Sequence, residues 1–308
     1  MTRCERVTAV FELREPDHTP VLGGWIACPQ HIMALAGATE DEYWEDPTSV
    51  SLRAYDALGV DGLISLYVPP RREDFRCVDA NSYVHADRGV ALGDAVAEIE
   101  AMPSPEKTEA QFDFEAAYAD FRQPLIEMQE RCGGMLWAPA QWGAGAQASW
   151  YGPFGYENYF AVIGLHPHLG QKLMEVGGAR GRCHSRLIAR AVEEGLYPGA
   201  VLLGEDICTQ RGPMISPAFL ERYWAPQLAY ELEPLLEKAP AASVVWVPAL
   251  SVPCAPLPLR NARDPQQDRH RAAGPAVGAG ELYAVNGNRP PLVGGIPLLA
   301  VDAAPAEQ

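Results

Sequence analysis

Two adjacent carboxylates, Glu205 and Asp206, follow an apolar run at 200–204 that is typical of a buried strand. Successive side chains on a strand point to opposite faces, so only one of the two can face a site. A carboxylate at a strand end can act as a general acid or base. The same position suits a carboxylate that caps a helix or binds a loop. Glu205 and Asp206 are therefore candidate catalytic residues, with the structural alternative still open.

Aromatic and polar side chains in two other segments could hold a substrate. Tyr151 could donate a hydrogen bond, and it is the third candidate catalytic residue. Trp25 and Trp142 could line an aromatic pocket, together with the neighbouring carboxamide of Gln141. A tryptophan that follows an apolar strand is also common in an ordinary core, and Tyr151 could be a plain rim aromatic. We take Trp25, Trp142 and Gln141 as substrate-binding candidates.

Cysteine and histidine spacing predicts no metal site. The chain has seven cysteines, an odd number, with no CxxC pair. Cys183 and His184 are adjacent on a predicted helix, whereas two ligands on one helix face are normally a turn apart. The simplest interpretation is free thiols in a reducing compartment.

Charge and hydropathy exclude several classes of protein. The formal net charge is −16, from 24 basic and 40 acidic residues, which argues against a nucleic-acid partner. No apolar run is long enough for a transmembrane helix, and charges from Arg3 to Glu15 leave no signal-peptide core. We therefore expect a cytoplasmic protein whose partner is a small molecule, with neither nucleic acid nor membrane.

Apolar strands that alternate with helical segments predict a parallel sheet with covering helices. A helix with a break at Gly177-Gly178 is expected over 167–194, and a β-excursion over 75–93. The expected fold is α/β, of the (β/α)₈ TIM-barrel type. It is expected to be incomplete at the C-terminus, because only about five strand–helix units precede a change in amino-acid composition. A doubly wound sheet is the alternative, although the GxGxxG and Walker A loops are absent. The strands are predicted at 20–26, 62–68, 134–139, 200–206 and 243–247.

Composition changes near Pro240. Residues 240–308 hold 11 of the 28 prolines and carry no net charge, whereas residues 1–239 carry the whole −16. The segment 250–308 is rich in Pro, Ala and Arg and has no periodicity. We therefore expect a partial barrel over 1–249 and a tail over 250–308 that is either disordered or a frameshifted end, with the frameshift preferred.

A resemblance to the uroporphyrinogen decarboxylase superfamily rests on an ordered set of motifs. The segment 199–228, GAVLLGEDICTQRGPMISPAFLERYWAPQL, resembles a family strand that ends in acidic residues and is followed by a Gly, a Ser-Pro helix start and a later Pro. Three more segments match in family order: ERVTAVFELREPDHTPV (5–21), ALGVDGLIS (57–65) and SWYGPFGYEN (149–158).

This resemblance implies a cleft at the C-terminal ends of the strands and a lyase- or methyltransferase-type enzyme. True uroporphyrinogen decarboxylation is not expected, because Trp25–Pro29 stands where the family has its two substrate-anchoring arginines, and Ser65–Tyr67 where it has a pocket Asp. Methyl transfer in the family uses zinc and a corrinoid partner. The zinc-binding His-x-Cys is absent here, so zinc with a corrinoid is expected only in an intact relative.

Two hypotheses follow from the resemblance and from the family motifs that this chain lacks. One is an enzyme of this superfamily acting on an unassigned small molecule. The other is a degenerate, non-catalytic or truncated barrel. Enzymes of the superfamily are often homodimers, which gives the expectation of a homodimer.

Overall fold

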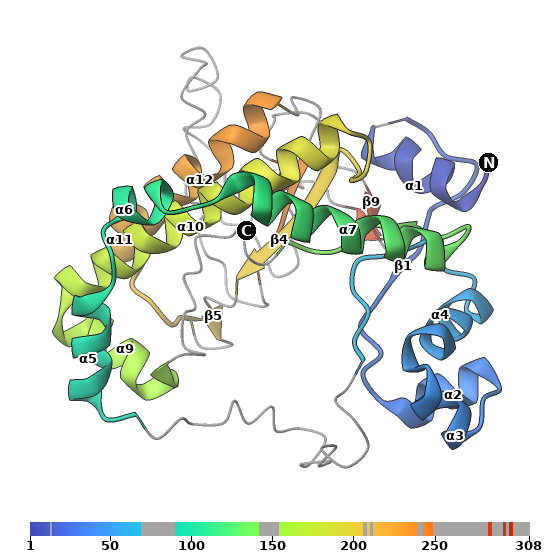
Figure 1. Ribbon diagram of the computed structural model, residues 1–308, viewed down its shortest axis with the longest axis horizontal. Coiled ribbons are helices and arrows are strands. Elements are labelled where there is room, and N and C mark those ends of the chain that lie inside the picture. The colour runs from blue at the N-terminus through green and yellow to red at the C-terminus, as the bar shows by residue number, and fades with distance from the viewer. Residues whose placement is uncertain are drawn as a thin grey trace, which may run out of the picture.

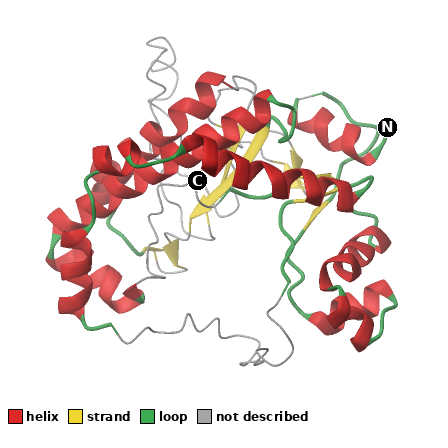
Figure 2. Cartoon of the chain, viewed as in Figure 1, coloured by secondary structure: helices red, strands yellow, loops and turns green. Residues whose placement is uncertain are grey.

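The computed structural model describes residues 1–12, 14–68, 90–141, 154–205, 208–209, 212–238 and 243–248, with three short strands further on. Helices dominate this part of the chain (Figure 2). They are α1 (Arg3–Phe11), α2 (Pro29–Ala36), α3 (Glu40–Glu45), α4 (Pro47–Ala57), α5 (Leu92–Ala101), α6 (Pro105–Ala110), α7 (Phe114–Cys132), α9 (Tyr156–Leu165), α10 (Pro167–Glu193), α11 (Pro217–Phe219), the π-helical turn η3 (Leu220–Trp224) and α12 (Ala225–Lys238).

The strands form small sheets. Parallel strands β1 (Leu22–Gly23), β2 (Gly62–Leu63) and β3 (Leu136–Trp137) make one sheet in that order. Strand β4 (Ala200–Glu205) pairs in parallel with β7 (Ser243–Pro248), and β8 (Tyr283–Ala284) pairs antiparallel with β7. Two antiparallel pairs complete the set: β5 (Cys208–Thr209) with β6 (Gly212–Pro213), and β9 (Leu292–Val293) with β10 (Ile296–Pro297).

One backbone hydrogen bond joins the two parallel sheets. The chain continues beyond β3 so that the Gln141 N–H donates to the Leu202 carbonyl at 3.0 Å. Ala138, directly after β3, and Ala200, which starts β4, also belong to one buried cluster, so the two segments run in the same direction and the carboxyl ends of β1, β2, β3 and β4 lie along one edge. All five strand positions predicted from sequence hold strands, and their mutual pairing is parallel.

The predicted (β/α)₈ barrel is nevertheless wrong. The described chain is mostly helical, and each of its first three parallel strands is only two residues long. In a barrel, the free edge of β7 would accept a further parallel strand. Here that edge pairs antiparallel with β8. A barrel closes only when successive parallel strands continue around to the first one, and no such closure exists among the described residues.

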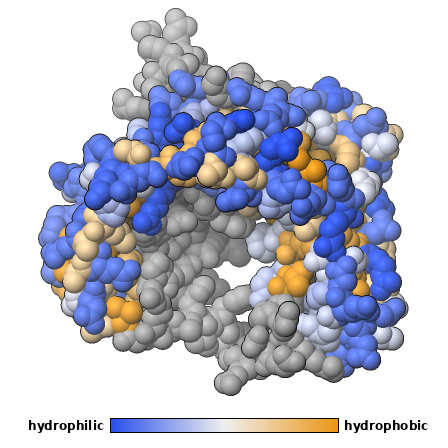
Figure 3. Space-filling model, in the orientation of Figure 1, coloured by the Kyte–Doolittle hydropathy of each residue, from blue (hydrophilic) through white to orange (hydrophobic). Residues whose placement is uncertain are grey.

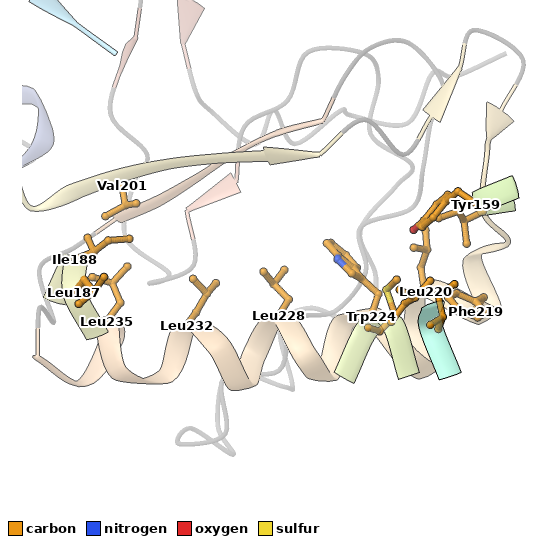
Figure 4. Packing of buried hydrophobic residues seen from close by; sticks show 14 of the residues in the cluster. Tyr159, Leu187, Ile188, Val201, Phe219, Leu220, Trp224, Leu228, Leu232 and Leu235 are labelled. Atoms are coloured by element: carbon orange, nitrogen blue, oxygen red, sulfur yellow. The ribbon is translucent and has the colours of Figure 1, made fainter. Parts of the chain in front are cut away.

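Three long helices pack together, with α7 against β3 and α12 against β4. Helices α7, α10 and α12 run side by side (Figure 1), and α10 contacts both of the others. Leu228, Leu232 and Leu235 of α12 point toward β4, from which Val201 points back (Figure 4), and all four are at most 2% exposed. This apolar contact is the centre of the main core.

The expected break of the helix at Gly177-Gly178 is also wrong, because α10 runs without interruption to Glu193. Gly178 instead permits close packing of α12. A Cβ at Gly178 would lie 2.6 Å from Oε1 of Gln227. The predicted β-excursion over 75–93 falls mostly outside the described residues, and its end is helical, since α5 begins at Leu92.

Helix caps follow the sequence closely. Thr39 caps α3 in a capping box with Glu42, and Ser216 caps α11. Asp46 caps α4: its Oδ1 accepts from the Ser49 N–H at 3.1 Å, and Arg131 donates to the same carboxylate at 2.8 Å. Hydrogen bonds from the Ser49 hydroxyl and backbone, with the Arg131 cation, lower the pKa of Asp46 to about 2.

Asp46→Ala is expected to lower the unfolding free energy by about 1 kcal/mol at neutral pH, because a cap is lost. The folded pKa of Asp46 lies below the ~3.9 of an unfolded chain. The stabilisation is therefore present above about pH 4 and is lost as pH falls toward the folded value. Urea unfolding at pH 7 and near pH 2.5 measures the difference. Glu45→Ala, at the neighbouring exposed position, is the control, and a difference that persists undiminished in acid would contradict the assignment.

Candidate functional site

The carboxyl edge of β1 and β2 is fixed by a very close backbone approach. Gly24 has φ +141°. A Cβ at this position would lie 2.5 Å from the carbonyl oxygen of Ser65 and 2.6 Å from the backbone nitrogen of Ser65. Beside this crossing, the Ile64 N–H donates to the Gly23 carbonyl at 3.0 Å. The two chain segments that leave these strands therefore start from one rigid point.

Two aromatic side chains are exposed immediately beyond this crossing. Trp25 is 62% exposed and Tyr67 is 44% exposed. On the inner side of the group formed by α2, α3 and α4, where these segments run, Figure 3 shows a gathering of apolar surface. Trp25 is a substrate-binding candidate from sequence, whereas Tyr67 was missed, although both lie near the C-terminal end of a predicted strand.

Buried tyrosines support the segment that carries Trp25. The Ile26 N–H donates to the hydroxyl of Tyr55 at 2.9 Å, and burial raises the pKa of that tyrosine. Burial also raises the pKa of Tyr43, with smaller contributions from the neighbouring Cys28 thiol and the Tyr67 hydroxyl. Cys28 and Tyr67 are therefore both in electrostatic range of Tyr43.

Gln141 occupies the same edge after β3, but its side chain is turned into the protein. It is 6% exposed. Its Nε2 donates to the Pro139 carbonyl at 3.0 Å, which leaves Oε1 facing Nε2 of His184 at 2.8 Å. The Tyr197 hydroxyl also donates to the Pro139 carbonyl. Gln141 thus links the end of β3 to His184 of α10. Its substrate-binding role remains a prediction.

His184 is the donor of its bond with Gln141, because the facing atom is a carbonyl oxygen. The neutral tautomer with the proton on Nε2 is thereby selected. The ring also meets Phe121 of α7 edge-on, with centroids 5.4 Å apart. Burial lowers the pKa of His184 and raises that of Tyr197. The sequence suggested only a metal role for His184 and gave no signal of this positioning contact, which joins residues 43 positions apart.

The lowered pKa of His184 predicts a pH-dependent stability. Below about pH 6.5 the unfolded chain takes up a proton on this imidazole that the folded protein resists. The unfolding free energy therefore decreases as the pH is lowered, by up to ~1.4 kcal/mol per pH unit. His184→Gln removes this titration and should flatten the dependence between pH 7 and pH 5. Urea unfolding of both proteins measures it, with His31→Gln on the exposed surface of α2 as control. An unchanged slope in His184→Gln would refute the assignment.

The remaining candidates are described in part or not at all. Glu205 ends β4, so its backbone lies at the same edge as Trp25 and Gln141, while its side chain is outside the described residues. Asp206, Tyr151 and Trp142 also lie outside the described residues, as does the tail over 250–308 apart from β8, β9 and β10.

The described segments at this edge lack the positive charges that an octacarboxylate site needs. The segments 24–28, 64–68 and 138–141 contain no charged side chain. Within the described part of the chain, no three His, Cys, Asp or Glu residues are grouped as a metal would need. The zinc of the methyltransferases therefore has no ligand set among these residues. None of the described helices is long and apolar enough to cross a membrane.

A charged network lies at the opposite, amino end of the strands. Arg6 of α1 is bonded to Asp61, directly before β2, and to Asp17, whose Oδ1 accepts from Nε at 2.6 Å. These bonds lower the pKa of Asp17 and raise that of Arg6. Asp61 also accepts from the Val21 N–H at 2.9 Å. This position serves stability, since it ties α1 to the start of two strands.

Comparisons with protein-family models, curated proteins and solved structures give no match to this chain.

Proposed function

We propose that the protein acts on a small organic molecule of low charge at the carboxyl edge of β1 to β4. The observation that carries the proposal is the exposure of Trp25 and Tyr67 beside a rigid backbone crossing, on segments without charged residues. Exposed aromatic rings bind flat or apolar ligands through their faces, and the carboxyl edge of parallel strands is where α/β proteins bind ligands.

The chemistry that we propose is of the lyase or methyltransferase type, as in the uroporphyrinogen decarboxylase superfamily that the sequence resembles. Glu205 at the end of β4, with Asp206 after it, would be the acid–base group. Uroporphyrinogen itself is disfavoured, because its carboxylates need arginine or lysine partners and the described segments of this edge supply none.

Binding of methylcobalamin and of uroporphyrin tests the ligand class. The first is a corrinoid without net charge, and the second is an octacarboxylate built on a related tetrapyrrole ring. We expect methylcobalamin to bind and uroporphyrin not to bind in equilibrium dialysis. Trp25→Ala should weaken binding about fivefold, or ~1 kcal/mol. Leu165→Ala, at an apolar position that is 67% exposed, is the matched control. Binding of uroporphyrin alone, or of neither compound, would overturn the proposal.

Turnover tests the enzymatic half separately. Methylcobalamin is incubated with a thiol acceptor, and uroporphyrinogen is tested for decarboxylation in parallel. Glu205→Gln should abolish turnover while binding is retained. Binding of methylcobalamin without its turnover would contradict the enzymatic half and support the non-catalytic alternative, and no turnover of uroporphyrinogen is expected.

A further inference from the structure

Two cysteines flank the place where α1 approaches the turn that follows α7. Cys4 lies on α1, half-buried, and its thiol donates to the Gly134 carbonyl at 3.4 Å. Gly134 belongs to a tight turn that starts at Cys132, closed by a bond from the Met135 N–H to the Cys132 carbonyl at 3.2 Å. Cys132 is 4% exposed. The hydrogen bond therefore holds the Cys4 sulfur in the same turn that Cys132 begins.

We propose that Cys4 and Cys132 form an intramolecular disulfide under oxidation, which fastens α1 to the α7–β3 turn. Residues that a disulfide joins must have Cα atoms within roughly 4.4–6.8 Å, and a contact between one cysteine and the turn containing the other favours such an approach. Burial, followed by the charge of the neighbouring Cys4 thiol, raises the pKa of Cys132 to about 11.

Exposure and pKa set the order of the steps. Cys4, the more accessible thiol, reacts first: its thiolate attacks one sulfur of a small disulfide such as oxidised glutathione, and one glutathione thiolate leaves. The Cys132 thiolate then attacks the Cys4 sulfur and releases the second glutathione. Two protein thiols are oxidised, one glutathione disulfide is reduced to two thiols, and the two thiol protons pass to the departing glutathiones.

Burial raises the pKa of both thiols, with Glu5 adding to the effect at Cys4. Because the thiolate is the reacting form, cross-linking should be slow at neutral pH and should accelerate as the pH is raised to 9.

The test is incubation of the folded, full-length protein with oxidised glutathione, followed by mass spectrometry without reduction. We expect the loss of two free thiols and two hydrogen masses, with a tryptic peptide beginning at Cys4 linked to one beginning at Cys132. The oxidised protein should also melt at a higher temperature, because the cross-link restricts the unfolded chain.

Cys4→Ser should abolish the link and the rise in melting temperature. It leaves the reduced fold intact, since a serine hydroxyl can donate to the same carbonyl. Cys28→Ser and Cys183→Ser should change neither result. A persistent glutathione adduct on Cys4 without the 4–132 link would overturn the proposal. The same holds for a link that forms only after unfolding in urea.

Discussion

Gly24→Ala is expected to destabilise the protein by about 2–5 kcal/mol, through steric overlap and backbone strain together. The new methyl group would lie 2.5 Å from a carbonyl oxygen of the neighbouring segment and 2.6 Å from its nitrogen. Both atoms belong to the Ser65 backbone, so no side-chain rotation can relieve the overlap. The two strand ends would have to separate, and the segment that carries Trp25 would move with them.

Gly59→Ala separates the two causes. Gly59 has φ +71°, but no atom lies within 4 Å of the position that its Cβ would take. It should therefore cost only the ~1–2 kcal/mol of a left-handed non-glycine residue. Urea unfolding of both variants gives the comparison. Equal losses in the two variants would mean that the close approach of Gly24 to Ser65 does not constrain the fold.

Asp61→Ala is expected to cost about 3–5 kcal/mol, because it leaves the guanidinium of Arg6 buried without its inner partner. The Asp61 side chain is 4% exposed and binds both Arg6 and the Val21 N–H. Three pieces of chain, namely α1, the start of β1 and the start of β2, meet at this one carboxylate.

Asp56→Ala is the matched control for this ion pair. Asp56 of α4 pairs with Arg3, which lies on α1 as Arg6 does. The Asp56 side chain, however, is 65% exposed. Exposed ion pairs contribute about 0–1 kcal/mol, so the control should unfold almost as the unaltered protein does. Comparable losses for Asp56→Ala and Asp61→Ala in urea would contradict the structural role given to Asp61.

Local signals in the sequence predicted the elements well. Apolar runs located all five parallel strands, and capping residues such as Thr39 and Ser216 located the helix starts. The barrel failed because closure is a property of the whole sheet, and the antiparallel partner of β7 comes from a segment without strand periodicity. The break expected at Gly177-Gly178 failed because tertiary packing against α12 outweighs the low helix propensity of glycine.

The candidate site was predicted in outline only. Trp25 could be found because it lies near the C-terminal end of a predicted strand, and the same signal would have found Tyr67. The contact between Gln141 and His184 could not be predicted, because it joins a loop to the middle of a distant helix. The network of Arg6 and Asp61 was missed for the same reason, since its partners are 55 positions apart.

The central claim, a ligand site of low charge beside Trp25, is tested most directly by fluorine NMR of the protein labelled with fluorotryptophan. The chain has seven tryptophans, and Trp25→Phe and Trp224→Phe assign the resonances of those two. Trp224 is buried in the core at 3% exposure and serves as the internal control. On titration with methylcobalamin, the Trp25 resonance should shift and saturate while that of Trp224 stays in place. A Trp25 resonance that methylcobalamin leaves unchanged, or that responds only to uroporphyrin, would contradict the claim.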